Sequence, residues 1–333
     1  MTETQSYSAT FQDKRVLITG GLGFMGSNLA RRLVDYDAKV VLVDSLIPEY
    51  GGNMVNVEGI EDAVTINISD VRDPFSMKHL VQGQDYMFNL AGQTSHLDSM
   101  RDPYTDLDIN CKAQLTILEA CRQHNPAIKV VFASTRQIYG KPDYLPVDEK
   151  HPLRPVDTNG VNKMAGEWYH ILYSNVYGIH TSVLRLTNTY GPRMRIKDNR
   201  QTFLGTWIKS VVTGEPFEVW GGEQLRDFTY VDDATDALLA AASDEKAKGQ
   251  IYNLGGDQII NLKDLAELLI NVNGTGEYNI RIFPEERKRI DIGDYYADFG
   301  LIQNTLGWQP KVGLQSGLEQ TLAFYKANIQ AYL

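Results

Sequence analysis

The chain is poor in cysteine, with only Cys111 and Cys121 among its 333 residues. Two cysteines cannot supply a disulfide scaffold or a cysteine-rich zinc site, and we expect both to be small core residues and no metal to be bound. Positive charge is also scarce, because 32 Lys and Arg face 42 Asp and Glu, a net charge of −10. This excess argues against nucleic-acid and anionic-membrane partners, although a few local arginines could still bind a small anion.

Long hydrophobic stretches are absent as well. The longest strictly apolar run, Ala237–Ala242, is far shorter than the roughly 18 residues that a membrane span requires. The first ten residues, MTETQSYSAT, lack the basic-then-apolar pattern of a secretory signal, and we expect them to form a loose tail. With 43% hydrophobic residues, the chain can still bury a large core. These features predict a cytoplasmic α/β protein without a membrane partner.

Short apolar runs alternate with helical patterns along the chain. Two long stretches, Asp106–His124 and Asn159–Val176, are predicted helices, and Met25, Leu29 and Leu33 mark the buried face of another. The predicted strands are Arg15–Thr19, Lys39–Val43, Val64–Asn67, Tyr86–Leu90, Lys129–Ala133, Ser182–Leu186 and Ile251–Leu254. Near-continuous apolar strands separated by helices indicate a parallel sheet covered on both faces. With right-handed crossovers this is a doubly wound α/β sheet of the Rossmann type.

After Leu186 the chain changes character, and we expect a smaller α/β domain that binds substrate. Its predicted elements are helices at Phe203–Val212 and Leu262–Ile270, a strand at Tyr278–Phe283 and a last helix ending near Tyr325. The strand at Ile251–Leu254 is expected to return to the first sheet, so the two domains interleave. The predicted division gives residues 11–187 plus about 227–257 to the cofactor domain, and 188–226 plus about 258–333 to the substrate domain.

A glycine-rich loop joins the first predicted strand to the first helix. It contains Gly20, Gly23 and Gly26, with Phe24 and Met25 at the start of the helix. Such glycines let backbone N–H groups approach a pyrophosphate, and the helix N-terminus supplies a positive end. Strand, loop and helix in this order favour a dinucleotide site over a plain turn.

Polar and small residues at the ends of the next strands fit the same cofactor. Asp44 ends the second strand, where an acid binds the ribose hydroxyls and repels the 2′-phosphate of NADP. NAD is therefore the expected cofactor. The other predicted cofactor contacts at strand ends are Asp70 and Val71, near the adenine, and Ala91, Gly92 and Gln93, beside a flat ring or ribose.

Several further segments resemble the extended short-chain dehydrogenase/reductase family, which comprises NAD-dependent nucleotide-sugar epimerases and dehydratases. The resemblance covers nearly the whole chain. The segments that carry it are Asn89–Gln93, Ser134–Gly140, Lys163–Glu167, Arg185–Arg193, Arg226–Asp233 and Leu306–Pro310. Several matches in the right order are far more specific than any one of them.

The resemblance implies roles for individual residues. Thr135 would hydrogen-bond the reacting sugar hydroxyl, and Lys163 would hold the nicotinamide ribose and lower the pKa of a neighbouring acid–base group. Asn110 would be a further cofactor contact. The implied substrate contacts are Ser134, Arg136, Asn188, Arg193, Arg226 and Arg289, with Arg287 as the alternative to Arg289. A guanidinium fork suits phosphate oxygens. The family also implies a homodimer joined through a four-helix bundle of the two long helices.

One departure from the family concerns the acid–base group. The family carries a Tyr four residues before the Lys, and that place is Asn159. An amide can orient a hydroxyl or a water but cannot take its proton, and a lost base typically costs about 10²–10⁴-fold in rate. Three substitutes remain open: Lys163 itself, His96 in the loop beside the nicotinamide, and a water held by Asn159 and Thr135.

A second departure narrows the reaction. Family dehydratases carry an Asp-Glu pair directly after the Thr, but this chain has Arg136 and Gln137, which cannot act as that pair. We therefore expect redox at a sugar carbinol, typically C4, by an epimerase. The alternatives are a one-way 4-dehydrogenase, a 4,6-dehydratase-like enzyme with altered acid–base groups, and a protein that binds NAD and sugar nucleotide without turnover. Arg136 would then meet an anionic or carbonyl group on the sugar.

Overall fold

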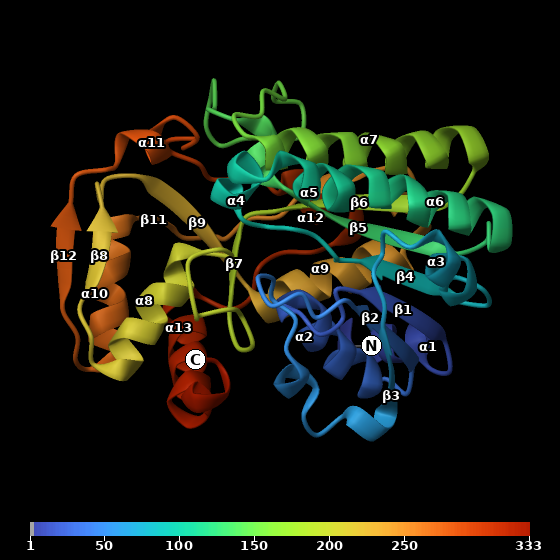
Figure 1. Cartoon of the computed structure of the whole chain (residues 1–333), viewed down its shortest axis with the longest axis horizontal. Helices are drawn as coiled ribbons and strands as arrows, with labels where there is room; N and C mark the ends of the chain where they lie inside the picture. The colour runs from blue at the N-terminus through green and yellow to red at the C-terminus, as the bar shows by residue number, and fades with distance from the viewer. Residues whose placement is uncertain (1–2) are drawn as a thin grey trace.

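The computed structural model describes residues 3–333, and its largest element is a sheet of seven parallel strands (Figure 1). The order across the sheet is β10-β6-β5-β4-β1-β2-β3. The strands are β1 (Arg15–Thr19), β2 (Lys39–Asp44), β3 (Val64–Ile68), β4 (Tyr86–Asn89), β5 (Lys129–Thr135), β6 (His180–Leu186) and β10 (Ile251–Asn253). Each predicted strand is present within a few residues of its expected bounds. The interior strand β1 is buried from Val16 onward, as a strand covered on both faces should be.

Helices cover both faces of this sheet, which confirms the doubly wound α/β fold. In Figure 1, α3, α6 and α7 lie on one side and α1, α2 and α9 on the other. The first layer contains α3 (Pro74–Leu80), α6 (Ala113–His124) and α7 (Thr158–Tyr177); the second contains α1 (Glu3–Phe11), α2 (Phe24–Val34), α9 (Val231–Ser243) and α12 (Gly300–Leu306). Leu17 faces the first core and Ile18 the second, because successive side chains of a strand point to opposite faces.

The predicted loose tail at the N-terminus is wrong for the part that the structure describes. Residues 3–11 form α1, and residues 1–2 lie outside the described range. Phe11 is fully buried, and its ring centroid lies 4.9 Å from that of Tyr86 and 6.4 Å from that of Phe88. Burying one aromatic ring supplies the free energy that the polar sequence of this helix does not, because helices gain most of their stability from packing.

The predicted helix at Asp106–His124 is helical throughout but not uniform. It comprises the end of α5 (Pro103–Leu107), a π-helical turn η3 (Asp108–Lys112) and α6. Such turns occur mostly as single bulges within helices, often at functional sites. Cys121 is buried, as expected, Cys111 is half-buried, and both are free thiols.

The smaller part of the molecule is built from two short sheets and the helices beside them. The three-stranded sheet has the order β11-β9-β7, and β12 pairs with β8 in parallel. These elements are β7 (Asn188–Tyr190), β8 (Phe217–Trp220), β9 (Leu225–Tyr230), β11 (Ile259–Asn261) and β12 (Tyr278–Arg281), with α8 (Phe203–Thr213), α10 (Leu262–Asn273), α11 (Glu285–Lys288) and α13 (Leu314–Asn328). Trp207, Leu265 and Leu318 belong to their shared core.

The return of the chain to the large sheet is confirmed, since β10 pairs in parallel with β6. The exact division of the chain into two domains stays a prediction. The remaining elements are α4 (His96–Arg101) and the 3₁₀ turns η1 (Met54–Val57), η2 (Glu61–Ala63), η4 (Arg136–Tyr139), η5 (Glu245–Ala247) and η6 (Ile329–Ala331).

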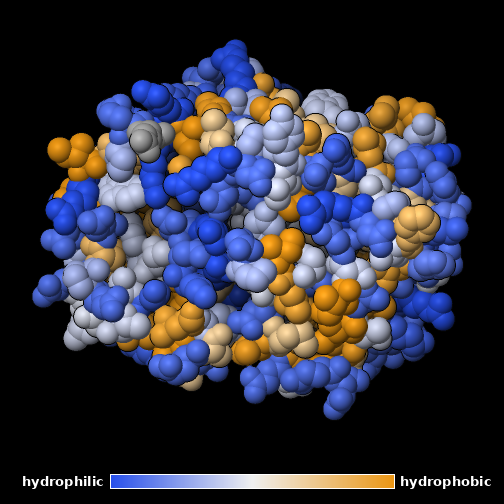
Figure 2. Space-filling view, viewed as in Figure 1, coloured by the Kyte–Doolittle hydropathy of each residue, from blue (hydrophilic) through white to orange (hydrophobic). Residues whose placement is uncertain are grey.

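Within residues 3–333, none of the helices has the length and apolar character needed to cross a membrane. On the face seen in Figure 2, apolar residues gather in several separate groups among hydrophilic ones.

Candidate functional site

A cavity of about 740 Å³ lies at the carboxyl ends of the large sheet's strands and reaches the smaller part of the molecule. The strand order reverses at β1, which lies between β2 and β4, because the chain first runs to one edge of the sheet through β2 and β3 and then toward the other through β4, β5 and β6. Ligands of open α/β sheets bind at this kind of position. The predicted site residues that line the cavity are Gly20, Gly23, Phe24, Met25, Gly26, Asp44, Asp70, Val71, Ala91, Gly92, Gln93, His96, Ser134, Thr135, Arg136, Asn159, Lys163, Asn188 and Arg226.

The glycine loop leaves the first turn of α2 open toward the cavity. Gly20 has φ +67°, and a Cβ on Gly26 would lie 2.2 Å from the carbonyl oxygen of Gly20. Only glycine therefore permits this close turn. The helix has no side-chain cap at Gly23, so backbone N–H groups of its first turn are left without partners. This is the arrangement in which a helix N-terminus binds a phosphate.

Two carboxylates lie further along the same wall. Asp44 accepts backbone N–H groups, Oδ2 from Leu22 at 3.1 Å and Oδ1 from Leu46 at 2.9 Å; burial raises its pKa, although these hydrogen bonds oppose the rise. Asp70 is held by Arg72, whose Nη2 lies 2.6 Å from its Oδ2. The Arg72 guanidinium lowers the pKa of Asp70, although burial opposes this.

Lys163 and Asn110 meet at Gly92. A Cβ on Gly92 would lie 2.9 Å from both Lys163 Nζ and Asn110 Oδ1. Lys163 is buried, donates to the carbonyl oxygen of Ala133 at 3.1 Å, and has a pKa lowered by burial to about 8, although Asp106 opposes the shift. Asn110 Oδ1 is buried without a hydrogen-bond partner in the described chain. An unpaired buried acceptor of this kind fits a ligand that brings a donor.

The hydroxyls that follow β5 have different surroundings. Thr135 Oγ1 accepts the N–H of Gln137 at 3.2 Å, which leaves its own proton free for the cavity. The Ser134 hydroxyl donates to Glu167 Oε2 at 2.8 Å, and Glu167 is itself paired with the buried Arg185. Thr135 can therefore donate to a ligand, whereas Ser134 is engaged in the scaffold behind it.

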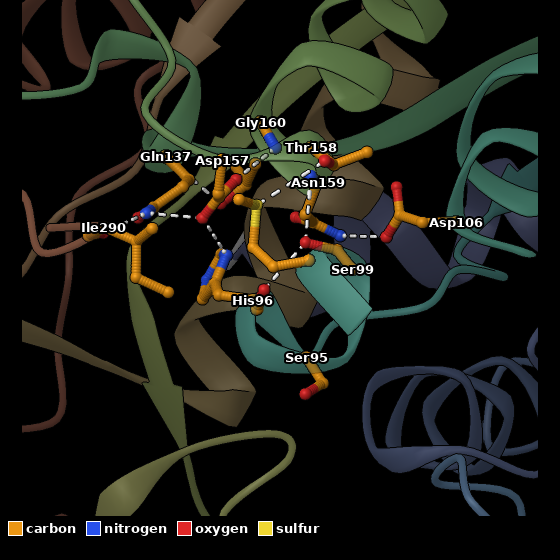
Figure 3. Close-up of polar contacts among 12 residues, drawn as sticks. Ser95, His96, Ser99, Asp106, Gln137, Asp157, Thr158, Asn159, Gly160 and Ile290 are labelled. Carbon is orange, nitrogen blue, oxygen red and sulfur yellow. Dashed lines mark hydrogen bonds and ion pairs between the residues drawn. The ribbon is translucent and has the colours of Figure 1, made fainter. Parts of the chain in front are cut away.

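Asn159 belongs to a cluster of amides around the fully buried Asp106. Its Nδ2 donates to the carbonyl oxygen of Gln93 at 2.8 Å and to Asp106 Oδ2 at 3.1 Å. Asn110 and Asn162 donate to the same carboxylate at 3.0 Å and 2.8 Å. These three amides satisfy a buried charge that would otherwise be costly. Figure 3 shows the Asn159 amide nitrogen turned toward Asp106, and its Oδ1 has no hydrogen-bond partner among the described residues.

His96, at the start of α4, faces a buried carboxylate. Its Nδ1 lies 2.9 Å from Oδ2 of Asp157, which caps α7 by accepting the N–H of Gly160 at 2.7 Å. Gln137 Nε2 donates to the same Asp157 oxygen at 2.9 Å and to the carbonyl oxygen of Ile290 at 3.2 Å. Burial acts to raise the pKa of Asp157, but His96 and the hydrogen bonds outweigh it and lower the pKa. Figure 3 shows His96 and Gln137 on the same carboxylate.

Two arginines line the cavity near the smaller sheets. Arg136 Nε is buried without a hydrogen-bond partner in the described chain, and its guanidinium lies over the ring of Tyr295, 5.6 Å from the centroid. Arg226 donates to the carbonyl oxygens of Leu225, at 2.8 Å, and Gly293, and its Nη2 lies 3.4 Å from Asp291. Burial and the nearby Arg136 charge lower the pKa of Arg226 to about 10. Two guanidinium groups this close favour an anion between or beside them.

Three predicted residues do not line the cavity. Asn110 lies directly behind Gly92, as described above. Arg193 donates to Asn28 Oδ1 at 2.9 Å and stacks over the ring of Phe324, which holds it away from the cavity. Arg289 is exposed at the end of the short helix α11. Its alternative, Arg287, lines the cavity and lies 4.0 Å from the centroid of the Trp220 ring.

Sequence reasoning also missed residues that the structure brings to the site. Asp157 was not singled out, although Asp three residues before Gly160 is the pattern of a helix cap. Arg195 and Arg200 line the cavity, and each is paired with an aspartate, at 2.6 Å to Asp198 and 2.9 Å to Asp98. Only their position in an arginine-rich segment could have marked them.

Comparisons with known proteins agree with this geometry. The sequence profile of the NAD dependent epimerase/dehydratase family matches residues 16–255. The chain is 31% identical over 316 residues to a Methanocaldococcus jannaschii protein provisionally named UDP-glucose 4-epimerase, covering 94% of this chain and 99% of that one. It is 29% identical to UDP-glucuronic acid decarboxylase 1 of Xenopus tropicalis, covering 95% of this chain and 73% of the relative.

Solved structures show the same fold. The UDP-glucose 4-epimerase of Thermotoga maritima, solved with UDP-glucose, is similar with a TM-score of 0.87 and 28% identity, over 95% of this chain and 99% of that one. The UDP-glucose 4-epimerase of Thermus thermophilus, solved with NAD, has a TM-score of 0.82 and 28% identity, over 94% and 99% of the two chains.

Proposed function

Because this chain belongs to the NAD-dependent epimerase/dehydratase family, we propose that it is a 4-epimerase of a nucleotide-diphosphate sugar. The family makes it an NAD-dependent enzyme that acts on nucleotide sugars. The observation that carries the finer proposal is one continuous cavity with the glycine loop and Asp44 on one side and Thr135 and Lys163 on the other.

The residues of the cavity fit NAD. The open first turn of α2 would hold the pyrophosphate, and Asp44 would accept the hydroxyls of the adenine ribose. Asn110 Oδ1 and Lys163 Nζ, both beside Gly92, would hold the nicotinamide ribose. When bound, NAD supplies the two-electron oxidation and reduction of the sugar carbinol.

Thr135 and Lys163 would act on the sugar and its surroundings. The Thr135 hydroxyl, whose proton is free, would donate to the carbinol oxygen and fix its position. The ammonium group of Lys163 would favour negative charge on that oxygen, and burial strengthens such an effect. Asn188, whose amide donates to the carbonyl oxygen of Asp227 at 3.0 Å, would offer its oxygen to the substrate.

The arginines would recognise the anionic part of the substrate. Arg226 would pair with the diphosphate, with Arg287 as a second cation on the same wall. Arg136, with its buried and unpaired Nε, would donate a hydrogen bond to an anionic or carbonyl oxygen of the sugar. These arginines would give the cavity a local positive charge, which explains how a chain of net charge −10 could bind an anionic substrate.

Epimerisation is favoured over dehydration by the residues that follow Thr135. Arg136 and Gln137 have no carboxyl group to act as an acid–base pair, and the Gln137 amide is held by Asp157 and Ile290. We also propose that Asn159 stands where the family has its tyrosine, so the proton acceptor is a different group.

The test is turnover of a panel of sugar nucleotides, namely UDP-glucose, dTDP-glucose and UDP-glucuronic acid. We expect at least one to yield its 4-epimer, detected by proton NMR, without net accumulation of NADH. Accumulating NADH would instead identify a one-way dehydrogenase, and binding without turnover would identify a non-catalytic protein. Thr135→Val is the matched negative control, since it keeps the shape of the residue but removes the hydroxyl.

We further propose that the protein forms a homodimer through α7. Val161, Trp168, Leu172 and Val176 lie at helical spacing on one face and are each between 47% and 61% exposed. Contiguous apolar surface of this kind marks an interface. Replacing Trp168 and Leu172 with Glu should give monomers by light scattering. Ile282→Glu, at an apolar side chain that is 95% exposed elsewhere, should leave the dimer intact.

A further inference from the structure

The wall of the cavity contains three groups other than carboxyls and arginines that can exchange a proton: Tyr50, His96 and Lys163. Tyr50 lies in the loop that follows Asp44, on the side proposed for the adenine ribose, and burial raises its pKa away from neutrality. Lys163 already donates to Ala133 and lies beside Gly92. His96 follows β4 and shares the wall with Thr135 and Asn159.

The His96 ring has a carboxylate on one side only. Nδ1 is 2.9 Å from Asp157 Oδ2, but this contact lacks the alignment of a hydrogen bond, and Nδ1 has no hydrogen-bond partner among residues 3–333. Such contacts often align fully only with substrate in place. The ring is about one-third exposed whereas the Asp157 side chain is fully buried. Nε2 is therefore the ring nitrogen left for a ligand in the cavity.

Several contacts hold this pair in place. Gln137 donates to the same Asp157 oxygen and to Ile290, so the carboxylate cannot turn away from His96 without losing hydrogen bonds. Ser99 Oγ donates to the carbonyl oxygen of His96 at 2.7 Å and accepts the N–H of Asn159 at 3.2 Å. This hydroxyl ties the start of α4 to the start of α7. The cluster is shown in Figure 3.

We propose that His96 takes the proton of the sugar hydroxyl at Nε2, and that Asp157 is the positioning residue that keeps the proton on Nδ1. The proposal rests on the proposed function. The O–H bond would break as an N–H bond forms at Nε2, the hydrogen of the carbinol C–H bond would leave with its electron pair as a hydride for which NAD is the oxidant, and the C–O bond would become a carbonyl. In the return half of the reaction, the ring gives the same proton back.

The surrounding charges are compatible with this role. Asp157 contacts the ring from the start of α7, and its negative charge stabilises the imidazolium that forms. Asp98 on the same helix as His96 is paired with Arg200 at 2.9 Å and with Arg101 at 3.7 Å. Lys163, further along α7, is the one cation of that helix on the cavity wall. Asn159 assists by offering Oδ1 as an acceptor, since its Nδ2 is engaged by Gln93 and Asp106.

The first arm of the test is kinetic and uses the sugar nucleotide that the wild-type protein turns over fastest. His96→Gln should lower kcat by about 10²–10⁴-fold, with KM and NAD affinity changed by less than about threefold. Asp157→Asn keeps a good helix cap and should lower kcat less than His96→Gln does, again with little change in KM, because the amide orients the ring less firmly than the carboxylate and does not stabilise the imidazolium. Free imidazole should partly restore His96→Gly.

His180→Gln is the matched control. His180 also lies beside a carboxylate, with Nδ1 3.4 Å from Glu245, but it begins β6, at the edge of the sheet opposite the cavity. This variant should keep the wild-type kcat and pH profile. If His96→Gln keeps both as well, the proposal is wrong and Lys163 becomes the proton acceptor.

The second arm needs no turnover. Nitrogen NMR of histidine-labelled protein should show the neutral His96 ring with its proton on Nδ1, and Asp157→Asn should shift the population toward Nε2–H. A neutral ring with its proton on Nε2 in the wild-type protein would overturn the proposal, because that nitrogen could not accept. If no sugar nucleotide is turned over, the proposed function fails and the catalytic role of His96 fails with it, whereas an Nδ1–H ring would still establish the geometry.

Discussion

The two sides of the cavity are constructed from different parts of the polypeptide. On the side of β1 and β2, binding groups are backbone N–H groups exposed by glycines, with Asp44 beside them. On the side of α4, η4 and α7, they are side chains held by one another, such as His96, Asp157 and Gln137. A site made of backbone groups tolerates no added Cβ, but its shape is set mainly by residues that are close together in the sequence. A side-chain site depends on segments that only the fold brings together.

The largest expected effect is on the backbone side. Gly26→Ala would place a Cβ 2.2 Å from the Gly20 carbonyl oxygen, and moving the loop should cost about 3 kcal/mol, or about 100-fold in NAD affinity. Titration of NAD by protein fluorescence measures this. Gly313→Ala, where a Cβ meets nothing within 4 Å, should bind NAD normally. Unchanged affinity in Gly26→Ala would end the distinction between the two sides.

The next largest effect is expected on the stability of the folded protein and concerns Lys163, which lies between the two sides. Burial lowers the pKa of Lys163 from 10.5 to about 8, so the unfolded chain binds that proton more tightly. Stability therefore rises with pH between about 8 and about 10.5 and is reduced by up to about 3 kcal/mol below this window. Lys163→Met should abolish activity yet unfold at a higher temperature than wild type at pH 7.

Thermal unfolding at pH 7 and near pH 10, without added NAD, measures the stability of both proteins. The gap between Lys163→Met and wild type should narrow as the pH rises. A gap that stays constant with pH would show that the ammonium is not the source of the instability, and that Lys163 is charged in the folded protein across this range.

A smaller effect is expected from placing a phenol at residue 159, on the side-chain side. Asn159→Tyr adds volume at a buried position and removes one amide from Asp106, so stability should fall by about 2 kcal/mol. Activity should be preserved or raised, as measured by epimer formation. Complete loss of activity in a folded Asn159→Tyr protein would show that the amide has a specific role. Activity would then depend on the amide hydrogen bonds around Asp106 more than on a titratable group at residue 159.

The smallest effect is expected at Asp70. Its carboxylate is partly exposed and paired with Arg72, and exposed pairs contribute less than about 1 kcal/mol. Asp70→Asn should therefore change NAD affinity by less than about fivefold, as measured by the same fluorescence titration. Asp44→Asn should weaken binding more, since Asp44 also holds backbone N–H groups of the loop. Equal effects would contradict this ranking.

The same contrast explains how far the sequence could predict the molecule. Parallel strands and the glycine loop are local patterns, and both are found where they were expected. The helix α1 was missed because it depends on Phe11 packing against β4, a contact between segments far apart in the sequence. Local propensity carries no information about such a partner.

The site residues divide in the same way. The sequence placed Lys163 and Thr135 through motifs, but Arg193 is held by Asn28 and Phe324, which no local pattern reveals. The choice between Arg287 and Arg289 depends on the orientation of a four-residue helix. Asp157 could be recognised as a helix cap, yet its contact with His96 requires the loop after β4 to meet the start of α7.

The π-helical turn at Asp108–Lys112 sets a limit on changes in chain length. It holds one residue more than an α-helical turn would, and each residue of a helix turns the chain by about 100°. Deleting a single residue there would rotate everything from Ser95 to Leu107 relative to α6. Asp106 would then leave its three amides, and the loop bearing His96 would turn with it. This segment therefore tolerates substitutions more readily than insertions or deletions.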